Sequence, residues 1–277
     1  VGTKADIARR TGMVEGLGFD LVAMVADDLA AAGAQPIAMT DYIAVGKLDV
    51  DRVEAIVESI ADACDEADIA LLGGETAEHP GVMASDQFDI SATALGIVEM
   101  GEEVDPGSVE SGDVIVGVMS PNLRSNGISL VRAIVASGLP LGDDFPDTTR
   151  STAEVLLDPS IVYSPAIVNM LARVQPHGLA HITGGGLPGN VIRVLPEGNR
   201  AVIERSRWQI PHVFNVLQKV GSVPPGDMYR TFNMGIGFVA VVAESDVDTT
   251  LRAFETSELE AGVIGHITEG DRGVEIR

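Results

Sequence analysis

Apolar residues recur about every 3.6 positions in several stretches of the chain, a spacing that predicts amphipathic helices. The first stretch runs from Phe19 to Ala32 and stops at Gly33, a residue typical of a helix C-cap. The clearest stretch runs from Asp51 to Glu66 and carries its apolar side chains on one face. The same spacing predicts further helices over residues 128–137, 151–157, 163–174, 186–195, 211–220 and 246–255.

Shorter apolar or alternating runs lie between these helices and predict β-strands. Helices and strands therefore alternate along the chain without an internal repeat, which indicates an α/β or α+β fold. The composition changes to Glu, Asp, Pro, Gly and Ser between residues 101 and 112, as is typical of a linker. We therefore divide the chain into an N-terminal domain, residues 1–104, and a C-terminal domain, residues 105–277. The predicted strands cover residues 37–45, 69–72, 88–98, 114–118, 179–182, 201–204, 236–243 and 263–267.

The composition excludes several classes of protein. No apolar run approaches the ~18–20 residues that cross a bilayer, and the charged N-terminus does not resemble a signal peptide. The single cysteine, Cys64, excludes an internal disulfide framework and a cysteine-based zinc site. Hydrophobic residues make up 45% of the chain and aromatic residues only 4%, so the core must consist of Ala, Val, Ile and Leu. We expect a globular cytoplasmic protein that does not bind a membrane.

The charge of the chain is strongly negative. It carries 41 acidic and 18 basic residues, which gives a net charge of −23, and only three of the basic residues are lysines. So acidic a protein is a poor partner for nucleic acid, whose phosphates need a basic surface. The same balance suits a salt-rich cytoplasm, where concentrated cations screen the repulsion between carboxylates. We favour this halophilic interpretation over that of an ordinary acidic enzyme.

Two clusters in the N-terminal half could bind phosphate or metal. In the first, residues 1–4, Gly2 lets the backbone approach a phosphate and Lys4 can neutralise it, although an ordinary exposed lysine would show the same pattern. The second is the pair Asp27 and Asp28 inside a mostly apolar helix, where a carboxylate is costly unless it is paired or binds a cation. Magnesium held by carboxylates and substrate phosphates would explain this pair, and a solvated helix face is the alternative.

A third cluster follows the strand predicted over residues 69–72. Glu75, Glu78 and His79 lie there between glycines, in the sequence Gly-Gly-Glu-Thr-Ala-Glu-His-Pro-Gly. Loops at the ends of strands often carry functional groups on a rigid scaffold. We therefore interpret this segment as a loop that belongs to a binding site, with a plain connector as the alternative.

Two more clusters, in the C-terminal half, open predicted helices. Ser125 and Asn126 precede Gly127 and could either cap a helix or leave its N–H groups free for a phosphate. The run from His181 to Gly189 contains G-x-G-x-x-G, and Glu204 follows at about the spacing of a ribose ligand. A dinucleotide-binding oxidoreductase is therefore an alternative. The chain contains no Walker P-loop motif, so any ATP must bind without one.

Taken together and in order, these segments resemble the phosphoribosylformylglycinamidine cyclo-ligase family, also called aminoimidazole ribonucleotide synthetases, of purine biosynthesis. The matches span essentially the whole chain, which makes them more specific than any single motif. They comprise residues 1–4, 20–24, 28–29, 41–44, 46–49, 73–81, 125–127, 129–132, 181–186, 193–196, 228–233 and 235.

The resemblance implies an ATP-dependent ring closure that needs Mg²⁺. Members of the family phosphorylate the amide oxygen of formylglycinamidine ribonucleotide (FGAM) with ATP. An internal nitrogen then displaces phosphate, and the products are aminoimidazole ribonucleotide (AIR), ADP and phosphate. The resemblance also implies a two-domain α/β architecture with a C-terminal α/β sandwich, and a homodimer whose N-terminal sheets form a shared barrel.

The resemblance also implies a role for individual residues. Asp28 is implied as the main magnesium ligand and a catalytic residue, with Asp27, Glu75 and Glu78 as further metal ligands. His181 is implied as a catalytic acid or base. The residues implied to contact ATP or the substrate phosphate, with Lys4 as the catalytic one, are Gly2, Thr3, Lys4, Asp27, Gly74, Glu75, Ser125, Asn126, Thr183, Gly184, Gly185 and Gly186.

The sequence departs from the family pattern in several places. The family's entry motif begins with Asp-Gly before Val1, so we expect that upstream sequence is missing. Residues 160–164, His79 and Arg124 also differ from the usual family residues, and these changes affect the expected contacts to the substrate phosphate. Selenophosphate synthetases and thiamine-monophosphate kinases are the nearest alternatives, and a non-catalytic scaffold is a further one. We also expect the apolar strand 37–45 to lie in a two-fold interface, because a dimer of so acidic a chain needs an uncharged contact.

Salt should stabilise this protein. The Debye length falls from about 10 Å at 0.1 M salt to about 3 Å at 1 M, which removes most of the repulsion among surface carboxylates. We therefore expect a higher melting temperature in molar KCl than in dilute buffer, measured by differential scanning calorimetry. Equal melting temperatures in the two conditions would contradict the halophilic interpretation.

Overall fold

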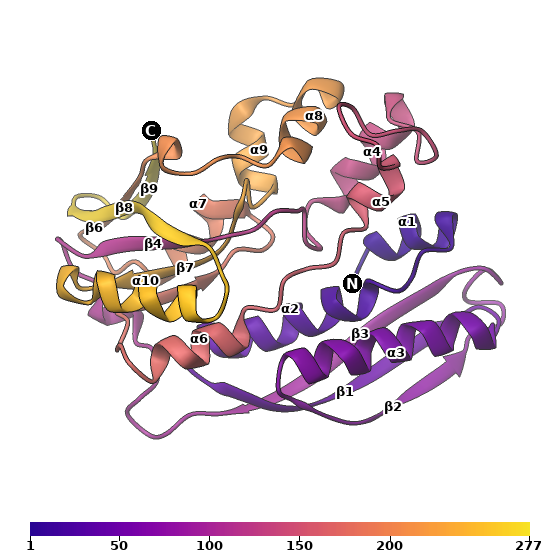
Figure 1. Ribbon diagram of the computed structural model, residues 1–277, viewed down its shortest axis with the longest axis horizontal. Helices are drawn as coiled ribbons and strands as arrows, with labels where there is room; N and C mark the ends of the chain where they lie inside the picture. The colour runs from indigo at the N-terminus through magenta and orange to yellow at the C-terminus, as the bar shows by residue number, and fades with distance from the viewer.

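The computed structural model describes residues 1–277 apart from the side chain of Pro106, and it contains two sheets of different kinds (Figure 1). The smaller sheet lies in the N-terminal half. Its central strand, β1 (Gln35–Val45), pairs in parallel with β2 (Ala70–Glu78) and antiparallel with β3 (Phe88–Ile97). Side chains of β3 alternate between more and less buried positions, as expected of a sheet that is covered on one face only.

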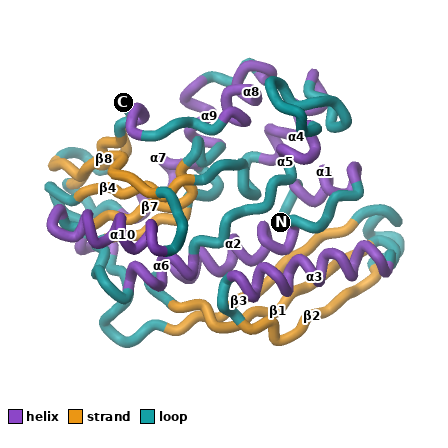
Figure 2. The backbone as a smooth tube through the Cα atoms, in the orientation of Figure 1, coloured by secondary structure: helices purple, strands orange, loops and turns teal.

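Two helices, α2 (Leu17–Ala31) and α3 (Val50–Glu66), cover the inner face of this sheet (Figure 2). They cross closely because Gly18 has no side chain: a Cβ there would lie 2.1 Å from the carbonyl carbon of Ser59. The end of α2 agrees with the prediction, since Gly33 follows it at a φ of 83° and its N–H bonds back to the last turn at 2.9 Å. Gly33 therefore marks the end of α2, and Gly18 allows α2 to pack closely against α3.

The larger sheet lies in the C-terminal half and has six strands, in the order β5-β7-β4-β8-β6-β9. Neighbouring strands are antiparallel except β6 and β9, which are parallel. The inner strand β7 is buried along its whole length, because helices pack on both faces of this sheet. The strands are β4 (Val114–Met119), β5 (Gly178–His181), β6 (Asn199–Ile203), β7 (Ile236–Val242), β8 (Ala261–Glu269) and β9 (Gly273–Ile276).

The remaining helices either cover this sheet or join the core of the N-terminal half. α6 (Ser164–Leu171) and α10 (Val247–Thr256) pack on one face of the larger sheet, and α7 (Gly186–Val191) packs on the other. No helix in the described part of the chain is long and apolar enough to cross a membrane. The helices that share a core with α2 and α3 are α1 (Lys4–Thr11), α4 (Ile128–Gly138), α5 (Thr152–Leu156), α8 (His212–Gly221) and α9 (Pro225–Thr231).

Helix α2 joins the two halves of the molecule. One side of it contacts β1 and β3, and the other contacts α6 and β5 of the C-terminal half (Figure 1). A continuous group of buried residues runs from the N-terminal sheet into the C-terminal helices, so the two halves share this core, while the larger sheet also has a core of its own. The domain boundary expected near residue 104 falls in the segment between the two sheets. Buried side chains from before and after this boundary nevertheless pack in one core.

The predicted helices and strands are present, with ends that shift by a few residues, whereas α1, α9 and β9 are not predicted from the sequence. One assignment is wrong. The segment Gly73–Glu78 is not a loop but continues β2, because Asp41–Val45 of the neighbouring strand supplies it with parallel hydrogen-bond partners. Polar residues are tolerated there because an edge strand of a one-sided sheet meets solvent.

The strand expected in a two-fold interface has one face in the core of its own chain. Met39, Ile43 and Val45 of β1 are buried beneath the helices. Ile37 and Tyr42 are 40% and 39% exposed and are the part of the strand that a second chain could reach. The interface itself stays a prediction.

The single cysteine should report unfolding. Cys64 is 1% exposed, and burial, followed by the charges of Asp65 and Asp41, raises the pKa of its thiol to about 11. Because the thiolate is the reactive form, we expect native protein at about pH 8 to react with an aromatic disulfide reagent only as fast as it unfolds. The measurement is the labelling rate as a function of urea. A labelling rate in native protein equal to that of a free thiol would contradict the burial of Cys64.

Candidate active site

Three aspartates of α2 meet the C-terminal half in different ways. Asp20 and Asp27 are seven residues apart, so they lie on one side of the helix, and both are fully buried. Asp28 lies about 100° further round the helix, and its side chain is 65% exposed. Of the predicted pair, only Asp27 is therefore a buried carboxylate that needs a partner.

The partner of Asp20 is Lys4, and the side chains of both are fully buried. Nζ of Lys4 lies 2.6 Å from Oδ2 of Asp20 and donates a hydrogen bond to the carbonyl oxygen of Asp158 at 2.9 Å. Ser160 donates to the other oxygen of Asp20 through its N–H and its hydroxyl. The structure therefore corrects the role expected of Lys4. Its ammonium group is held inside the protein, because a buried charge is stable only when it is paired and hydrogen-bonded.

The partner of Asp27 is Arg124, whose side chain is 1% exposed. Oδ2 of Asp27 accepts a hydrogen bond from Nη2 of Arg124 at 2.7 Å. Oδ1 accepts from the backbone N–H groups of Tyr163 at 2.8 Å and Ser164 at 2.9 Å. These contacts occupy both oxygens and neutralise the charge, so a guanidinium takes the place expected for magnesium. The expected role of Asp27 as a metal or nucleotide ligand is corrected accordingly.

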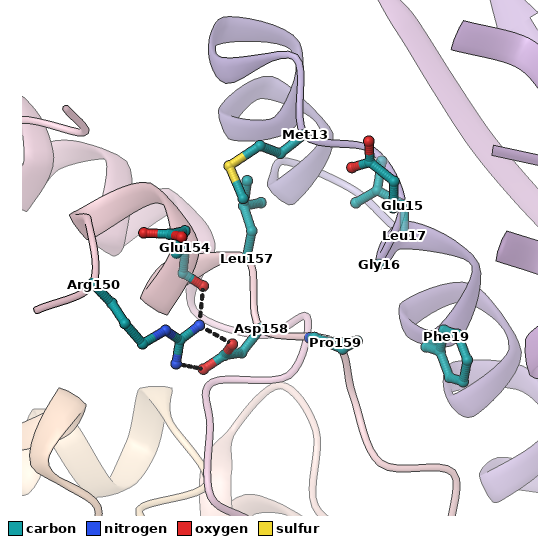
Figure 3. A pocket seen from close by; sticks show the side chains of 10 residues that line it. All are labelled: Met13, Glu15, Gly16, Leu17, Phe19, Arg150, Glu154, Leu157, Asp158 and Pro159. Carbon is teal, nitrogen blue, oxygen red and sulfur yellow. Dashed lines mark hydrogen bonds and ion pairs between the residues drawn. The ribbon is translucent and has the colours of Figure 1, made fainter. Parts of the chain in front are cut away.

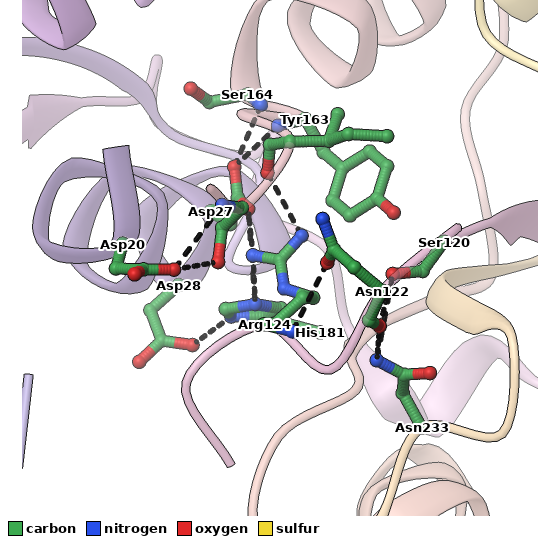
Figure 4. A network of polar contacts seen from close by, with 12 residues as sticks. Asp20, Asp27, Asp28, Ser120, Asn122, Arg124, Tyr163, Ser164, His181 and Asn233 are labelled. Atoms are coloured by element: carbon green, nitrogen blue, oxygen red, sulfur yellow. Dashed lines mark hydrogen bonds and ion pairs between the residues drawn. The ribbon is translucent and has the colours of Figure 1, made fainter. Parts of the chain in front are cut away.

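Arg124 connects α2 to several segments of the C-terminal half (Figure 4). Its Nη1 donates to the carbonyl oxygen of Ile161 at 2.9 Å, and its guanidinium carbon lies 4.7 Å from the centre of the Tyr163 ring. Its Nη2 also lies 3.0 Å from Nε2 of His181. Burial alone would lower the pKa of Arg124, but the charge and hydrogen bond of Asp27, together with those of Tyr163, outweigh burial and the pKa is raised. Arg124 is therefore always a cation.

Both ring nitrogens of His181 are engaged. Arginine can only donate hydrogen bonds, so Nε2 must accept from Arg124, and the ring hydrogen is on Nδ1. Nδ1 lies 2.7 Å from Oδ1 of Asp28 and donates to it. The ring also stacks on Phe238, with 6.1 Å between the ring centres and 19° between the planes. His181 therefore holds Asp28 in place, and the structure leaves neither nitrogen free for the expected acid or base role.

Asp28 is the carboxylate that remains available to a ligand. Its Oδ1 accepts the hydrogen bond from His181, and its Oδ2 has no hydrogen-bond partner within the described chain. The side chain lies at the junction of the two halves, beside the end of β5. An oriented carboxylate with one free oxygen can bind a cation together with substrate phosphates.

A glycine-rich loop follows His181 at the end of β5. Gly185 and Gly186 have φ values of 98° and 61°, a conformation that favours glycine. The side chain of Asn190 donates to carbonyl oxygens of the loop, the nearest being that of Gly186 at 2.8 Å. A Cβ on Gly186 would lie 2.0 Å from the carbonyl oxygen of Tyr229, so this glycine also lets α9 approach. The loop is thus held in one shape while the glycines before Gly186 are exposed.

The loop that carries Ser125 and Asn126 meets this glycine loop. A Cβ on Gly184 would lie 3.9 Å from Oδ1 of Asn126. Oγ of Ser125 and Nδ2 of Asn126 are shielded from solvent and have no hydrogen-bond partner among the described residues. Neither side chain caps α4, whose N-cap is Gly127. Unpaired donors next to a glycine-rich backbone suit a phosphate group.

The glycine motif does not belong to a dinucleotide-binding fold. Such a motif functions within a parallel βαβ unit. Here β5 pairs antiparallel with β7, and the next strand along the chain, β6, is separated from β5 by β7, β4 and β8. The dinucleotide alternative is therefore wrong, although the glycines keep their capacity to approach a phosphate.

Gly2 and Thr3 line a cavity of about 440 Å³ at the start of α1. Arg9 and Arg132 also line it, and both are paired with Asp6, at 2.7 and 2.8 Å. Thr3 is the N-cap of α1, and no side chain caps this end of the helix. The cavity is the place where Gly2 and Thr3 could meet a phosphate.

The structure does not gather the predicted metal ligands. Glu75 and Glu78 lie on the edge strand β2, whereas Asp28 lies on α2 against the other half of the molecule. Oε1 of Glu78 accepts the N–H of Leu48 at 2.6 Å, and Glu75 lies opposite Tyr42 in the sheet register. In the described part of the chain, no three acidic, histidine or cysteine side chains form a group that could hold a metal ion. The site of four carboxylates implied by the resemblance is therefore not assembled within one chain.

Another cavity, of about 310 Å³, lies between the α1–α2 turn and α5 (Figure 3). The arginine that lines it, Arg150, forms a two-pronged ion pair with Asp158 and donates to the carbonyl oxygen of Glu154. Asp158 is also the residue whose carbonyl oxygen accepts from Lys4. Asp158 is therefore the lining residue that connects this cavity to Lys4, and the lining offers no unpaired arginine.

The residues that hold the site together are mostly not predicted from the sequence. In the sequence, Arg124 is notable only as a departure from the family pattern. No role is expected there for Tyr163 or Ser164. One signal was available: a carboxylate on an apolar helix needs a cation, and Arg124 lies directly before the Ser125 cluster. The spacing of residues along the chain does not reveal that Asp27 and Arg124 are in contact, because they are 97 positions apart.

These features define a class of protein: a two-domain α/β protein with a cluster of polar groups and a glycine-rich loop where its two halves meet. Comparison with known families is more specific. The N-terminal domain of the AIR synthase related protein family matches residues 1–98, and its C-terminal domain matches residues 110–277. The chain belongs to this family, and the predicted α/β two-domain fold class is confirmed.

Close relatives by sequence are phosphoribosylformylglycinamidine cyclo-ligases. The enzyme from Carboxydothermus hydrogenoformans is 44% identical over 276 residues, covering 99% of this chain and 80% of that protein. That from Anaeromyxobacter dehalogenans is 43% identical over 274 residues, with coverages of 99% and 79%. That from Sorangium cellulosum is 44% identical over 271 residues, with coverages of 96% and 78%. The resemblance drawn from the sequence is therefore confirmed.

Solved structures with other activities share the fold. A thiamine-monophosphate kinase from Stenotrophomonas maltophilia has a TM-score of 0.71 at 22% identity, covering 95% of this chain and 78% of that one. The hydrogenase maturation protein HypE in complex with ATP has a TM-score of 0.69 at 18% identity, covering 94% and 75%. At these identities the likeness shows the fold alone.

Proposed function

We propose that this protein is an ATP-dependent cyclo-ligase that converts FGAM to AIR, with ADP and phosphate as the other products. The observation that carries the proposal is the 44% identity to a cyclo-ligase across 99% of the chain. The unpaired donors of Ser125 and Asn126 beside the glycine loop support it, since both substrates carry phosphate groups. A thiamine-monophosphate kinase activity has only a likeness of fold in its favour.

The proposed reaction has two steps. The amide oxygen of FGAM attacks the γ-phosphorus of ATP, and ADP leaves. The internal nitrogen then attacks the activated carbon, forms the C–N bond of the ring, loses a proton and expels phosphate. An amide oxygen is a poor leaving group and phosphate a good one, so the first step makes the second possible. The protein contributes mainly positioning and charge stabilisation to such a transfer.

The two loops at the domain junction bind phosphate in this proposal. Ser125 and Asn126 supply side-chain donors that have no partner among the described residues. Thr183 supplies a hydroxyl, and the exposed Gly184 and Gly185 supply backbone that a phosphate can approach closely. Gly186 shapes the loop, because its N–H already bonds to the carbonyl oxygen of Thr183 at 3.0 Å.

Asp28 is the residue whose chemistry fits Mg²⁺. This ion is usually held by one or two carboxylates together with substrate phosphates, and Asp28 presents one hydrogen-bonded carboxylate with a free oxygen. When bound, Mg²⁺ would neutralise charge on the phosphoryl group being transferred. His181 orients Asp28, and Asp27 takes no part because Arg124 already neutralises it.

Other contacts to ATP would come from two places. Gly2 and Thr3 line the cavity at the start of α1. Gly74 and Glu75 lie on the exposed edge strand β2, where the carboxylate of Asp41 packs against Gly74 in the space that a Cβ would take. We retain these four residues as nucleotide contacts and leave out Lys4, which is fully buried.

We also propose that two chains associate through the outer face of the smaller sheet. Leu72, Leu95 and Ile97 are 65%, 59% and 57% exposed, and no element of the described chain covers this face (Figure 1). An apolar face of this kind is typical of an interface between proteins. A second copy would cover it and join the two sheets into the shared barrel that the family resemblance implies.

The setting of the proposed enzyme is a salt-rich cytoplasm. The net charge of −23 supports this, because dissolved cations are needed to screen it. The cytoplasmic location rests on the proposed reaction, which is a step of purine biosynthesis.

The substitution Asp28→Asn should lower turnover far more than stability. The side chain is 65% exposed, so the melting temperature should change little. Loss of the charge should cost roughly 10²–10³ in rate, as is typical when one group that stabilises transition-state charge is removed. The measurement is ADP release from ATP with FGAM, made alongside the melting temperature.

The matched control is Asp62→Asn, which changes an exposed aspartate on α3 and should alter neither quantity. Turnover of Asp28→Asn within about threefold of the unmodified protein would remove Asp28 from the site. Such a ratio corresponds to a change in activation free energy under ~1 kcal/mol. ADP release with thiamine monophosphate but not with FGAM would refute the cyclo-ligase proposal itself.

Leu95→Asp should convert the proposed dimer to a monomer. The substitution places a charge on the outer face of β3, where a second sheet would have to desolvate it. Light scattering after gel filtration measures the mass in solution. Val50→Asp, at a position that is 64% exposed on α3, is the control and should leave the dimer intact. A monomeric unmodified protein, or a dimer that survives Leu95→Asp, would contradict the interface.

A further inference from the structure

Arg124 makes one contact that its role as the partner of Asp27 does not require. Its Nη2 donates to Oδ2 of Asp27 at 2.7 Å and also lies 3.0 Å from Nε2 of His181. The backbone of Arg124 has a φ of 56°, a conformation that residues other than glycine rarely adopt. The side chain is thus fixed at a point where α2 and the end of β5 meet (Figure 4).

This second contact sets the direction of a chain of hydrogen bonds. Since arginine cannot accept, Nε2 of His181 is the acceptor and Nδ1 carries the hydrogen. Nδ1 then donates to Oδ1 of Asp28 at 2.7 Å. The side chain of His181 is only 2% exposed, so water has little access to replace Arg124 as the donor.

A competing acceptor lies close to the same ring. Oδ2 of Asp27 is 3.8 Å from Nε2 of His181, and Arg124 is bonded to both atoms. If Arg124 were absent, a buried carboxylate without its partner would attract a hydrogen to Nε2. A neutral ring that donates to Asp27 cannot donate to Asp28 as well.

We propose that Arg124 is a positioning residue for Asp28. It prevents Asp27 from competing for the hydrogen of His181, so that the ring donates to Asp28 and fixes its carboxylate. This role deepens the proposed function and rests on it for its kinetic consequence. The hydrogen-bond direction can be tested without any substrate.

The experiment compares four variants with the unmodified protein at one pH and below all melting temperatures. Arg124→Met removes the donor and leaves the competitor. Asp27→Asn/Arg124→Met removes both, Asp27→Asn removes only the competitor, and Arg124→Lys keeps a donor. Nitrogen NMR of protein labelled at its five histidines reports which of the two ring nitrogens of His181 carries a hydrogen, with His181→Gln to assign the signals. ADP release with FGAM gives kcat and KM.

Arg124→Met should move the ring hydrogen of His181 from Nδ1 to Nε2 and lower kcat by about 10- to 100-fold, as loss of a partner behind a metal ligand typically does, with KM for FGAM within about threefold. The double variant should free Nε2 again and recover most of kcat. Asp27→Asn and Arg124→Lys should keep Nε2 free of hydrogen, and both should lower kcat less than Arg124→Met does. Should Arg124→Met fail to fold, these last two variants still carry the test.

Three results would overturn the role of Arg124. They are a hydrogen that remains on Nδ1 in Arg124→Met, equal losses of kcat in Arg124→Met and Asp27→Asn, and a raised KM with unchanged kcat. A hydrogen on Nε2 in Arg124→Lys would overturn it as well. If the unmodified protein releases no ADP with FGAM, the proposed function fails, while the NMR comparison still decides whether Arg124 directs His181.

Discussion

The buried ion pair between Asp27 and Arg124 is the interaction on which the relation of the two domains depends. Asp27 lies on α2, which packs on the N-terminal sheet, and Arg124 belongs to the C-terminal half. Removing one partner of such a pair typically costs about 3–5 kcal/mol, because the other charge is left buried and uncompensated. The halves cannot separate without that cost. The Lys4–Asp20 pair, seven residues earlier on the same side of α2, lies within the N-terminal half, and hydrogen bonds with Asp158 and Ser160 connect it to the C-terminal half.

The same pair explains which carboxylate is free to act. Asp27 is neutralised by Arg124 and accepts hydrogen bonds from two backbone N–H groups. Asp28, the next residue, faces solvent and accepts a hydrogen bond from His181. Asp28 comes from α2 and His181 from the end of β5, while the Ser125 loop precedes α4. No single domain holds all these groups, so the packing of the domains and the geometry of the site have one cause.

The fold is largely predictable from the sequence, because the period of apolar residues marks most helices and strands. The candidate site is predictable only in part. Asp28, Ser125, Asn126 and the run 183–186 come from the sequence and lie at the domain junction. The burial of Lys4 and the pairing of Asp27 cannot be predicted from the sequence, because they depend on tertiary contacts. Asp27 and Arg124, for example, are separated by 97 positions. The continuation of β2 through Glu75 also depends on a distant partner, the parallel strand β1.

The most direct test of this account is a crystal structure of the protein with Mg²⁺, a non-hydrolysable ATP analogue and FGAM. We expect a magnesium ion about 2.1 Å from Oδ2 of Asp28, with His181 still bonded to Oδ1. Phosphate oxygens should lie against Ser125, Asn126 and the glycine loop, and Asp27 should remain on Arg124. Magnesium bound by Glu75 and Glu78 with Asp28 free in solvent would contradict the account. So would an Asp27 that leaves Arg124 to coordinate the ion.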